Sequence, residues 1–134
     1  MPENNYLVPY IIEFPKIGDR GLGYISVSEK ATLPFTVKRI YWTYFTPEDV
    51  TRGGHAHYEL EQILLAVSGR VTVRTEVMGT KLQFILEKPF LGLFLPKMCW
   101  HEMTYSHNAV QVCFASIEYS EDDYIRRYDD FKRL

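Results

Sequence analysis

Two histidines and an arginine lie close together near the middle of the chain, in the segment Arg52-Gly-Gly-His-Ala-His57, and carboxylates follow at Glu59 and Glu61. In a β-strand, residues i and i+2 project from the same face. His55 and His57 are therefore expected to point together from one sheet surface. On the inner wall of a β-barrel, such a pair of imidazoles is either a metal site or an acid–base site.

A third histidine extends the metal interpretation. Glu61 follows His57 by four residues, and His101 follows Pro96 by five, and both spacings resemble the cupin signature. The glycine usual between that proline and the last histidine is absent. The spacing therefore indicates a jelly roll more strongly than a metal ion. A His₃-carboxylate cage for Fe, Mn, Ni or Zn would consist of His55, His57, Glu61 and His101. His107, in a Ser-His-Asn turn, is interpreted as a structural or exposed residue.

The elements around these histidines are predicted to be strands. Turn signals recur at short spacing, and the segment from Arg70 to Val77 alternates polar with apolar residues, as a sheet with one wet face requires. Many short strands without an intervening helical pattern indicate a sandwich or a barrel. The runs richest in β-branched and aromatic residues are Tyr24–Val27, Val37–Phe45, Gln62–Val67, Arg70–Val77, Lys81–Leu86, Leu91–Leu95 and Val110–Ile117.

The C-terminus has a different pattern, which predicts a helix over about 120–134. Ser120 is placed as its N-cap, acidic residues occupy the first turn, and Lys and Arg occupy the last. Tyr124, Tyr128 and Phe131 share one helical stripe. We interpret this stripe as a packing surface against the barrel or a partner subunit, not as a ligand site.

Composition sets the broad class. The 134 residues predict one domain over 1–134, and the net charge of −2 with a pI near 6.1 provides no basic footprint for nucleic acid. No run approaches the roughly 18 apolar residues of a membrane span. The polar start Met1–Asn5 does not resemble a signal peptide. Cys99 and Cys113 are expected to be a reduced pair. The sequence thus predicts a cytoplasmic protein.

Several blocks together resemble the sugar 3,4-ketoisomerases that act on dTDP-4-dehydro-6-deoxy-D-glucose and have the small WxcM-like cupin domain. The resemblance runs from about Phe14 to Lys132 and preserves order and spacing. The blocks are Pro34–Tyr41, Arg52–His57, Leu60–Gln62, Gly92-Leu93, Trp100–Met103 and Tyr119–Asp129. The resemblance implies an all-β, cupin-type double-stranded β-helix. It also implies a homodimer with strand exchange near the N-terminus, and an isomerase that uses neither a metal nor another cofactor.

The chain departs from the family pattern at three positions. Gly54 stands where an aromatic residue is common, Trp42 replaces a frequent second tyrosine, and Cys99 replaces an aliphatic residue. Gly54 is expected to loosen a loop just before His55 and to alter substrate contacts. None of the three departures removes a candidate catalytic group.

The implied reaction moves a ketone from C4 to C3 of a sugar. A base takes the C3 proton, an enediolate forms, and a proton returns to C4. Histidine suits this task because its ordinary pKa is about 6.5. By resemblance, His55 is the base and Tyr41 hydrogen-bonds at the reacting centre, while His57 and Arg52 position the substrate or polarise its oxygens. Without the resemblance, Tyr41 would be interpreted as an aromatic core residue.

The remaining candidates concern substrate binding. Guanidinium groups suit a pyrophosphate, and the candidates are Arg39, Arg52 and Arg74, with Lys38 as a point charge. The candidates for stacking on thymine are Trp42, Tyr44 and Phe45. Family members with arginine and histidine at the positions of Arg20 and His101 resemble the galacto-forming type. The expected product is therefore dTDP-3-dehydro-6-deoxy-α-D-galactose, a precursor of a 3-amino sugar in a surface glycan.

Three other functions stay open at this point. The first is a metal-dependent cupin enzyme that uses His55, His57, Glu61 and His101. The second is a non-catalytic cupin that binds a nucleotide sugar. The third is a 3,5-epimerase, which is also a jelly roll acting through a histidine base on the same nucleotide sugar.

Overall fold

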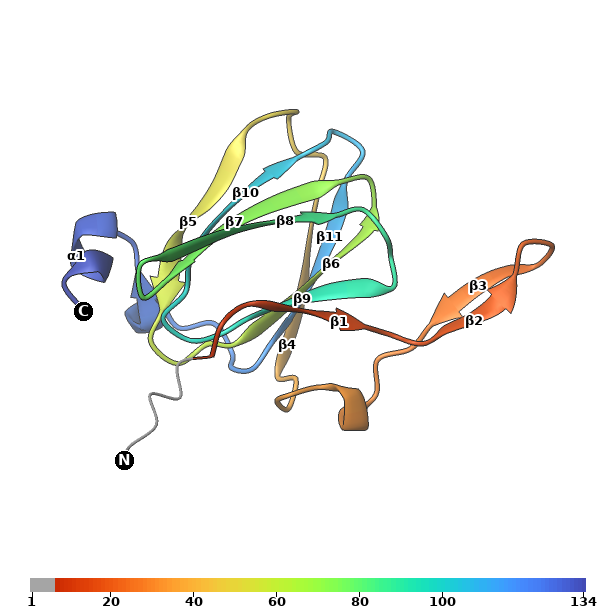
Figure 1. The fold of residues 1–134 in the computed structure, drawn as a ribbon, viewed down its shortest axis with the longest axis horizontal. Coiled ribbons are helices and arrows are strands. Elements are labelled where there is room, and N and C mark those ends of the chain that lie inside the picture. The colour runs from red at the N-terminus through yellow and green to blue at the C-terminus, as the bar shows by residue number, and fades with distance from the viewer. Residues whose placement is uncertain (1–6) are drawn as a thin grey trace.

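Two five-stranded antiparallel sheets pack face to face in the computed structural model, which describes residues 7–134 (Figure 1). The first sheet has the order β1 (Tyr10–Glu13), β9 (Leu91–Leu95), β6 (Gln62–Ser68), β11 (Val110–Ala115) and β4 (Arg39–Tyr44). The second has the order β12 (Tyr124–Ile125), β5 (Thr51–His57), β10 (Trp100–Tyr105), β7 (Val71–Val77) and β8 (Thr80–Leu86). The expected all-β jelly roll with a short C-terminal helix is confirmed.

The remaining elements are short. Strands β2 (Lys16–Asp19) and β3 (Gly23–Ser26) form a separate hairpin, the 3₁₀ turns are η1 (Lys30–Thr32) and η2 (Glu121–Asp123), and the helix α1 covers Tyr128–Lys132. Within the described range, no helix has the length and apolar character needed to cross a bilayer. The segment Met1–Asn5, for which we expected no signal peptide, lies outside the described residues.

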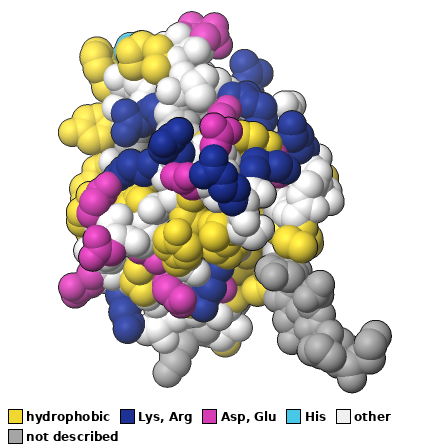
Figure 2. Space-filling model, turned by 90° about the vertical axis from the view of Figure 1, so that its left-hand side faces the viewer, with side chains coloured by type: hydrophobic (Ala, Val, Ile, Leu, Met, Phe, Trp, Pro, Cys, Tyr) yellow, Lys and Arg dark blue, Asp and Glu magenta, His cyan; other side chains and the backbone are white. Residues whose placement is uncertain are grey.

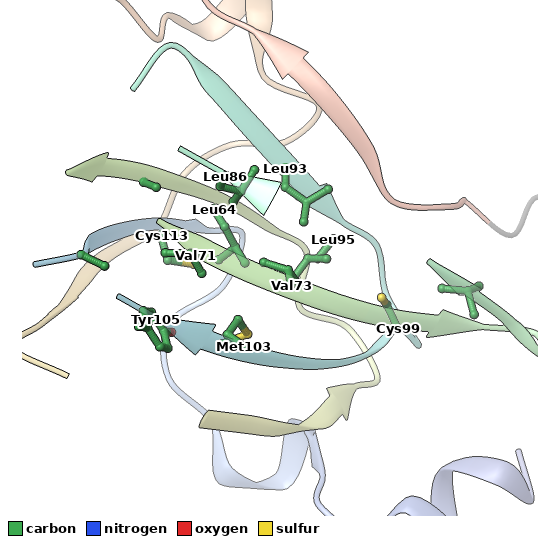
Figure 3. Packing of buried hydrophobic residues seen from close by; sticks show 13 residues of the cluster. Leu64, Val71, Val73, Leu86, Leu93, Leu95, Cys99, Met103, Tyr105 and Cys113 are labelled. Atoms are coloured by element: carbon green, nitrogen blue, oxygen red, sulfur yellow. The ribbon is translucent and has the colours of Figure 1, made fainter. Parts of the chain in front are cut away.

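The main core lies between the two sheets, where inward-facing residues of both meet (Figure 3). On β7 the predicted alternation holds only in the first half of the strand, where Val71 and Val73 are buried and Thr72 and Arg74 partly exposed. From Thr75 to Val77 all three residues are buried. The fully buried residues that fill this core include Leu64, Val71, Val73, Leu86, Leu93, Leu95 and Cys113. Both cysteines are free thiols, as expected.

A second apolar cluster covers the outer face of the first sheet. Phe14, Ile63, Leu65 and Phe94 are buried there, and Phe35 packs against them from the N-terminal part of the chain. Strand β6 is therefore buried on both faces, which explains why its sequence is a continuous apolar run rather than an alternating one.

The β2–β3 hairpin projects from the body of the molecule on the side opposite α1 (Figure 1). Its two strands pair only with each other among the described residues. The hairpin is nevertheless apolar, and Leu22 at its turn is 93% exposed and Ile25 66% exposed. Exposed apolar patches of this kind mark interaction sites.

The C-terminal segment is not one helix over 120–134, as the sequence predicted. Ser120 makes no side-chain cap, residues 121–123 form a 3₁₀ turn, and Tyr124 and Ile125 pair with His57 and Ala56 of β5. The α-helix is confined to α1. Backbone pairing with the edge of the sheet outweighs the local helical preference at Tyr124. The Tyr124 side chain therefore lines a cavity and does not lie on a helical stripe.

A buried carboxylate anchors α1 to the barrel. Glu76 on β7 accepts hydrogen bonds from the Tyr128 hydroxyl at 2.6 Å and from Lys132 Nζ at 2.8 Å, while Phe131 packs beside Trp100. Burial alone would raise the pKa of Glu76, but these two hydrogen bonds outweigh it and hold the pKa below its ordinary value. α1 lies on the side that Figure 2 shows, where Lys and Arg side chains gather beside a hydrophobic area.

We expect Tyr128→Phe to lower the free energy of unfolding at pH 7, because the Glu76 carboxylate loses a hydrogen bond. The depressed pKa of Glu76 means that this stabilisation is present above the unfolded pKa of about 4.3. It is lost as the pH falls through the folded value. Urea unfolding of both proteins at pH 7 and below pH 4 measures the difference. Tyr58→Phe, at an exposed tyrosine, is the matched control, and an equal loss there would contradict the assignment.

Candidate active site

A cavity of about 220 Å³ opens inside the barrel between the two sheets. Most lining side chains alternate along their strands, as inward-facing residues must. They come from β4, β5, β6, β10, β11 and β12. The lining residues are Arg39, Tyr41, Thr43, Arg52, His55, Gln62, Leu64, His101, Met103, Tyr105, Gln111 and Tyr124.

Two glycines let Arg52 and His55 line the same cavity although they are three residues apart. Odd spacing in a regular strand places side chains on opposite faces. Here the pairing of β5 with β10 shifts, since His101 pairs with His55 and Glu102 with Gly53, so that Gly54 is extra. Gly53 and Gly54 have φ of 85° and 76°, which favour glycine. This β-bulge re-aims Arg52. Gly54 is therefore part of β5 and does not loosen a loop, contrary to expectation.

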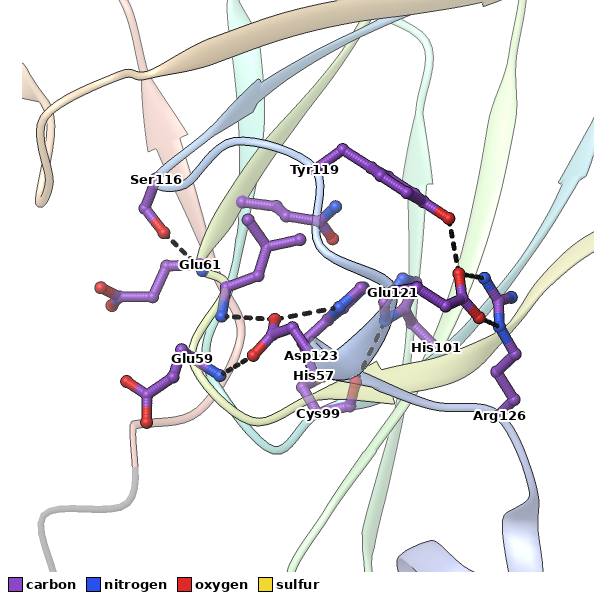
Figure 4. Close-up of polar contacts among 12 residues, drawn as sticks. His57, Glu59, Glu61, Cys99, His101, Ser116, Tyr119, Glu121, Asp123 and Arg126 are labelled. Atoms are coloured by element: carbon purple, nitrogen blue, oxygen red, sulfur yellow. Dashed lines mark hydrogen bonds and ion pairs between the residues drawn. The ribbon is translucent and has the colours of Figure 1, made fainter.

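The three histidines of the sequence prediction are brought together. The ring centroid of His55 lies 4.9 Å from that of His57 and 4.8 Å from that of His101. One nitrogen from each ring lies within 4.8 Å of the others, so this group could hold a metal ion. Glu61 does not belong to the group, and its side chain points away from His57 in Figure 4. The predicted carboxylate of the metal cage is thus not in place.

Burial keeps the imidazoles neutral. Burial, followed by the charges of His101 and Arg126, lowers the pKa of His55 to about 3. Burial also lowers the pKa of His101, whose Nδ1 lies 3.1 Å from the Cys99 carbonyl oxygen. The neutral His101 ring donates to this carbonyl from Nδ1 and keeps a lone pair on Nε2. For His55, the lowered pKa means that the ring is an unprotonated acceptor at neutral pH.

Tyr41 supplies the opposite function. Its hydroxyl accepts a hydrogen bond of 3.0 Å from Gln62 Nε2. Burial, with Cys113 as the next cause, raises the pKa of Tyr41 above its ordinary value, so the hydroxyl keeps its proton. A proton acceptor, His55, and a proton donor, Tyr41, thus line the same cavity. General acid–base chemistry requires such a pair.

The predicted substrate-binding residues separate into two groups. Arg39 and Arg52 line the cavity, and Arg39 Nε is buried without a hydrogen-bond partner among the described residues. Arg20, at the turn of the β2–β3 hairpin, does not line this cavity within one chain. Lys38 is not among the lining residues, and Arg74 lies near Glu102, with 3.8 Å between Nη2 and Oε2.

The aromatic candidates for stacking on thymine do not line the cavity. Tyr41 points inward on β4, so Trp42 and Tyr44 project from the other face and are exposed. Phe45 packs edge-on against His107, whose Nδ1 lies 2.8 Å from the Thr46 carbonyl oxygen. His107 is thus a structural residue, as expected.

Three residues of the C-terminal segment were not predicted as part of the site. Tyr124 lines the cavity and contacts His57 with a centroid distance of 4.4 Å. Arg126 lies 4.0 Å over the Tyr124 ring and forms two hydrogen bonds to Glu121, of 2.6 and 2.8 Å. Asp123 lies beside His57, with 3.4 Å between Oδ2 and Nδ1 (Figure 4). The predicted helix hid all three, because pairing with β5 has no local sequence signal.

Together the fold and the cavity define a cupin-type jelly roll with a histidine cluster in the barrel. The chain belongs to the WxcM-like family, since the family model described as "FdtA: WxcM-like, C-terminal" matches residues 8–134.

Named relatives show the same similarity. TDP-4-oxo-6-deoxy-alpha-D-glucose-3,4-oxoisomerase of Aneurinibacillus thermoaerophilus is 36% identical over 124 residues, 92% of this chain and 89% of that protein. A 3,4-ketoisomerase from Helicobacter canadensis is 38% identical with a TM-score of 0.88, covering 93% of this chain and 95% of that one. A mutant of the 3,4-ketoisomerase from Thermoanaerobacterium thermosaccharolyticum, with histidine replaced by asparagine and TDP-4-keto-6-deoxyglucose bound, is 33% identical with a TM-score of 0.87, covering 92% and 90%.

The 3,5-epimerases share only the fold. The dTDP-4-dehydrorhamnose 3,5-epimerase of Sulfolobus tokodaii is 17% identical with a TM-score of 0.75, covering 92% of this chain and 78% of that one. This likeness places both chains in one architecture and transfers no activity.

Proposed function

We propose that this protein is a nucleotide-sugar 3,4-ketoisomerase that converts dTDP-4-dehydro-6-deoxy-D-glucose to a dTDP-3-dehydro-6-deoxyhexose. The observation that carries the proposal is the pairing of a neutral imidazole, His55, with a protonated hydroxyl, Tyr41, in one cavity. The named relatives act on this class of substrate. At about 220 Å³, the cavity is smaller than the roughly 300–1,000 Å³ of pockets that enclose a whole ligand. It therefore takes the sugar, and the nucleotide lies outside.

In the proposed reaction, His55 takes the proton from C3, which the neighbouring C4 ketone acidifies. The electron pair left on C3 forms the C3–C4 double bond, and the C4 oxygen becomes the enolate oxygen. The Tyr41 hydroxyl donates a hydrogen bond to that oxygen, which takes up a proton and becomes the C4 hydroxyl. The C3 hydroxyl then releases its proton and becomes the ketone, while C4 is protonated from the imidazolium. Further donors are Arg52 and the Nε of Arg39, which has no hydrogen-bond partner within residues 7–134.

We propose the galacto configuration for the product, on the resemblance of Arg20 and His101 to the pair found in galacto-forming members. His101 lines the cavity and Arg20 of the same chain does not. For both to act on one substrate, Arg20 has to come from a second copy of the chain.

We therefore propose a homodimer in which the β2–β3 hairpin of each chain reaches the cavity of the other. The hairpin projects away from its own barrel (Figure 1) and exposes Ile17, Leu22 and Ile25. The outer face of β4 also exposes Ile40, Trp42 and Tyr44. A second copy would cover such apolar surfaces. Light scattering after size exclusion tests the dimer, and the two free thiols fit a reducing, cytoplasmic compartment.

Proton NMR in D₂O with EDTA-treated protein and dTDP-4-dehydro-6-deoxyglucose tests the function. The expected result is a ketone that moves to C3 with deuterium at C4, and the coupling of the C4 position distinguishes gluco from galacto. Turnover only after addition of Fe²⁺ or Mn²⁺ would favour the metal-dependent cupin. Binding without turnover would favour the non-catalytic protein, and deuterium at C5 would indicate epimerisation.

The low pKa of His55 predicts an unusual pH profile. A base must be unprotonated, so a base of pKa about 3 stays active as the pH falls from 8 to 5. A histidine with an ordinary pKa of about 6.5 would lose roughly thirtyfold over that range. We expect kcat/KM, which reports the free enzyme, to stay nearly constant between pH 5 and 8. Activity recovered on return to pH 7.5 controls for denaturation, and an acid limb near pH 6.5 would contradict the prediction.

A further inference from the structure

Asp123 is a buried carboxylate that the proposed reaction does not use. It is 8% exposed and lies in η2, directly before β12. Its Oδ1 accepts the N–H of Glu59 at 2.8 Å and its Oδ2 the N–H of Leu60 at 3.1 Å (Figure 4). Its backbone carbonyl accepts the N–H of Tyr58 at 3.1 Å. Asp123 therefore holds the chain immediately after His57.

His57 needs a hydrogen-bond partner on the same side. The ring is only 3% exposed, and neither of its nitrogens has a partner within hydrogen-bonding geometry among the described residues. Buried polar atoms rarely stay unpaired. Asp123 Oδ2 lies 3.4 Å from His57 Nδ1 (Figure 4). Catalytic hydrogen bonds are often long without substrate and shorten when it binds. A carboxylate only accepts, so the proton belongs on Nδ1 and the lone pair on Nε2.

The orientation of His57 affects the proposed base directly. The His57 ring packs edge-on against His55, at 4.9 Å between centroids, and against Tyr124, at 4.4 Å. It does not line the cavity itself. His57 thus packs directly behind His55, and a rotation of the His57 ring would displace His55. The family resemblance predicted His57 on the substrate, whereas the ring lies behind His55 and does not line the cavity.

We propose that Asp123 is a positioning residue that acts through His57: its carboxylate fixes the Nδ1–H tautomer and the ring plane of His57, and thereby the position of His55. The catalytic consequence rests on the proposed isomerase function. The simpler interpretation is that Asp123 only stabilises the turn of residues 58–60 through the two backbone hydrogen bonds.

The tautomer can be measured without any substrate. Long-range ¹H–¹⁵N correlation spectra of the histidine rings distinguish Nδ1–H from Nε2–H, and we expect His57 to be Nδ1–H. Asp123→Asn removes the negative charge that favours Nδ1–H, so the Nε2–H tautomer of His57 should gain population. Asp122→Asn is the matched control, since it removes the same charge from an exposed neighbour. An Nε2–H tautomer in the unmodified protein would overturn the proposal.

Kinetics then separate positioning from turn stability. We expect Asp123→Asn to lower kcat by about tenfold to a hundredfold, by comparison with the hydrogen-bond partners of metal-ligating histidines, while KM changes little. In a His57→Phe background, which removes the intermediary, Asp123→Asn should cost no further activity. Losses that multiply in the double variant would show a structural role. Unchanged kcat in Asp123→Asn would also overturn the proposal.

The two proposals fail in different ways. If the unmodified protein does not move the ketone, the isomerase function is wrong, and the ring spectra still report whether Asp123 fixes His57. If the unmodified protein moves the ketone but the Asp123→Asn results differ from those expected, the isomerase function is retained and the positioning role is wrong.

Discussion

Replacement of His55 by asparagine is expected to lower kcat by about 10²–10⁴-fold, the usual contribution of a general base. The imidazole is neutral in the cavity because burial and nearby positive charges lower its pKa to about 3. Asparagine fills part of the same space and offers hydrogen bonds, but it cannot take a proton from carbon. Because the nucleotide is proposed to lie outside the cavity, KM should change much less than kcat.

Single-turnover NMR with the dTDP-sugar measures this loss, and circular dichroism and titration with dTDP verify that folding and nucleotide binding persist. His107→Asn is the matched control, because His107 lies outside the cavity and contacts only structural groups. A His55→Asn variant whose rate stays within a few-fold of the unmodified protein would assign the base to another residue, and Tyr41 and His101 would be tested next.

A mixed dimer is expected to regain activity that neither parent variant has. If the β2–β3 hairpin of each chain completes the cavity of the other, one chain with Arg20→Ala and one with His55→Asn reconstitute a single intact site. The intact Arg20 lies in the hairpin of the His55→Asn chain. That hairpin reaches the cavity of the partner chain, which still has His55. The other site carries both defects. A purified heterodimer should therefore show about half the activity of the unmodified dimer.

Co-expression with two different affinity tags isolates this heterodimer. Each homodimer measured alone provides the background, and a mixture of two homodimers that have not exchanged chains controls for additive residual activity. If Arg20 acted on its own chain, both sites of the heterodimer would carry one defect each, and no activity would return. That result would rule out hairpin exchange and assign Arg20 to the site of its own chain.

The sequence predicted the histidine cluster because two independent patterns agree. Spacing of two along a strand places His55 and His57 on one face, and strand alternation elsewhere requires a barrel for that face to line. Their ring centroids lie 4.9 Å apart, as this reasoning requires. The strands β6, β7 and β9 were also predicted within a residue or two, because β-branched and aromatic runs bounded by turn residues have few other interpretations.

The rest of the site depends on contacts that local patterns do not contain. The bulge at Gly53 and Gly54 is set by pairing with β10, so its effect on Arg52 appears only once the strands are aligned. Residues 120–125 have helical composition, but their pairing with β5 decides their conformation. The segment was therefore assigned to the wrong element, and with it Asp123 and Tyr124.

The attachment of Asp123 and Tyr124 to β5 also bears on how the protein is made. A nascent chain emerges from its N-terminus, and domains generally fold as units during or after synthesis. His55 and His57 leave the ribosome well before the residues that hold and enclose them, which come near the end of the chain. A product that stops before residue 120 would contain most strands of both sheets and the three histidines. It would lack β12 and the carboxylate behind His57, so the order of synthesis makes the closing of this cavity one of the last steps of folding.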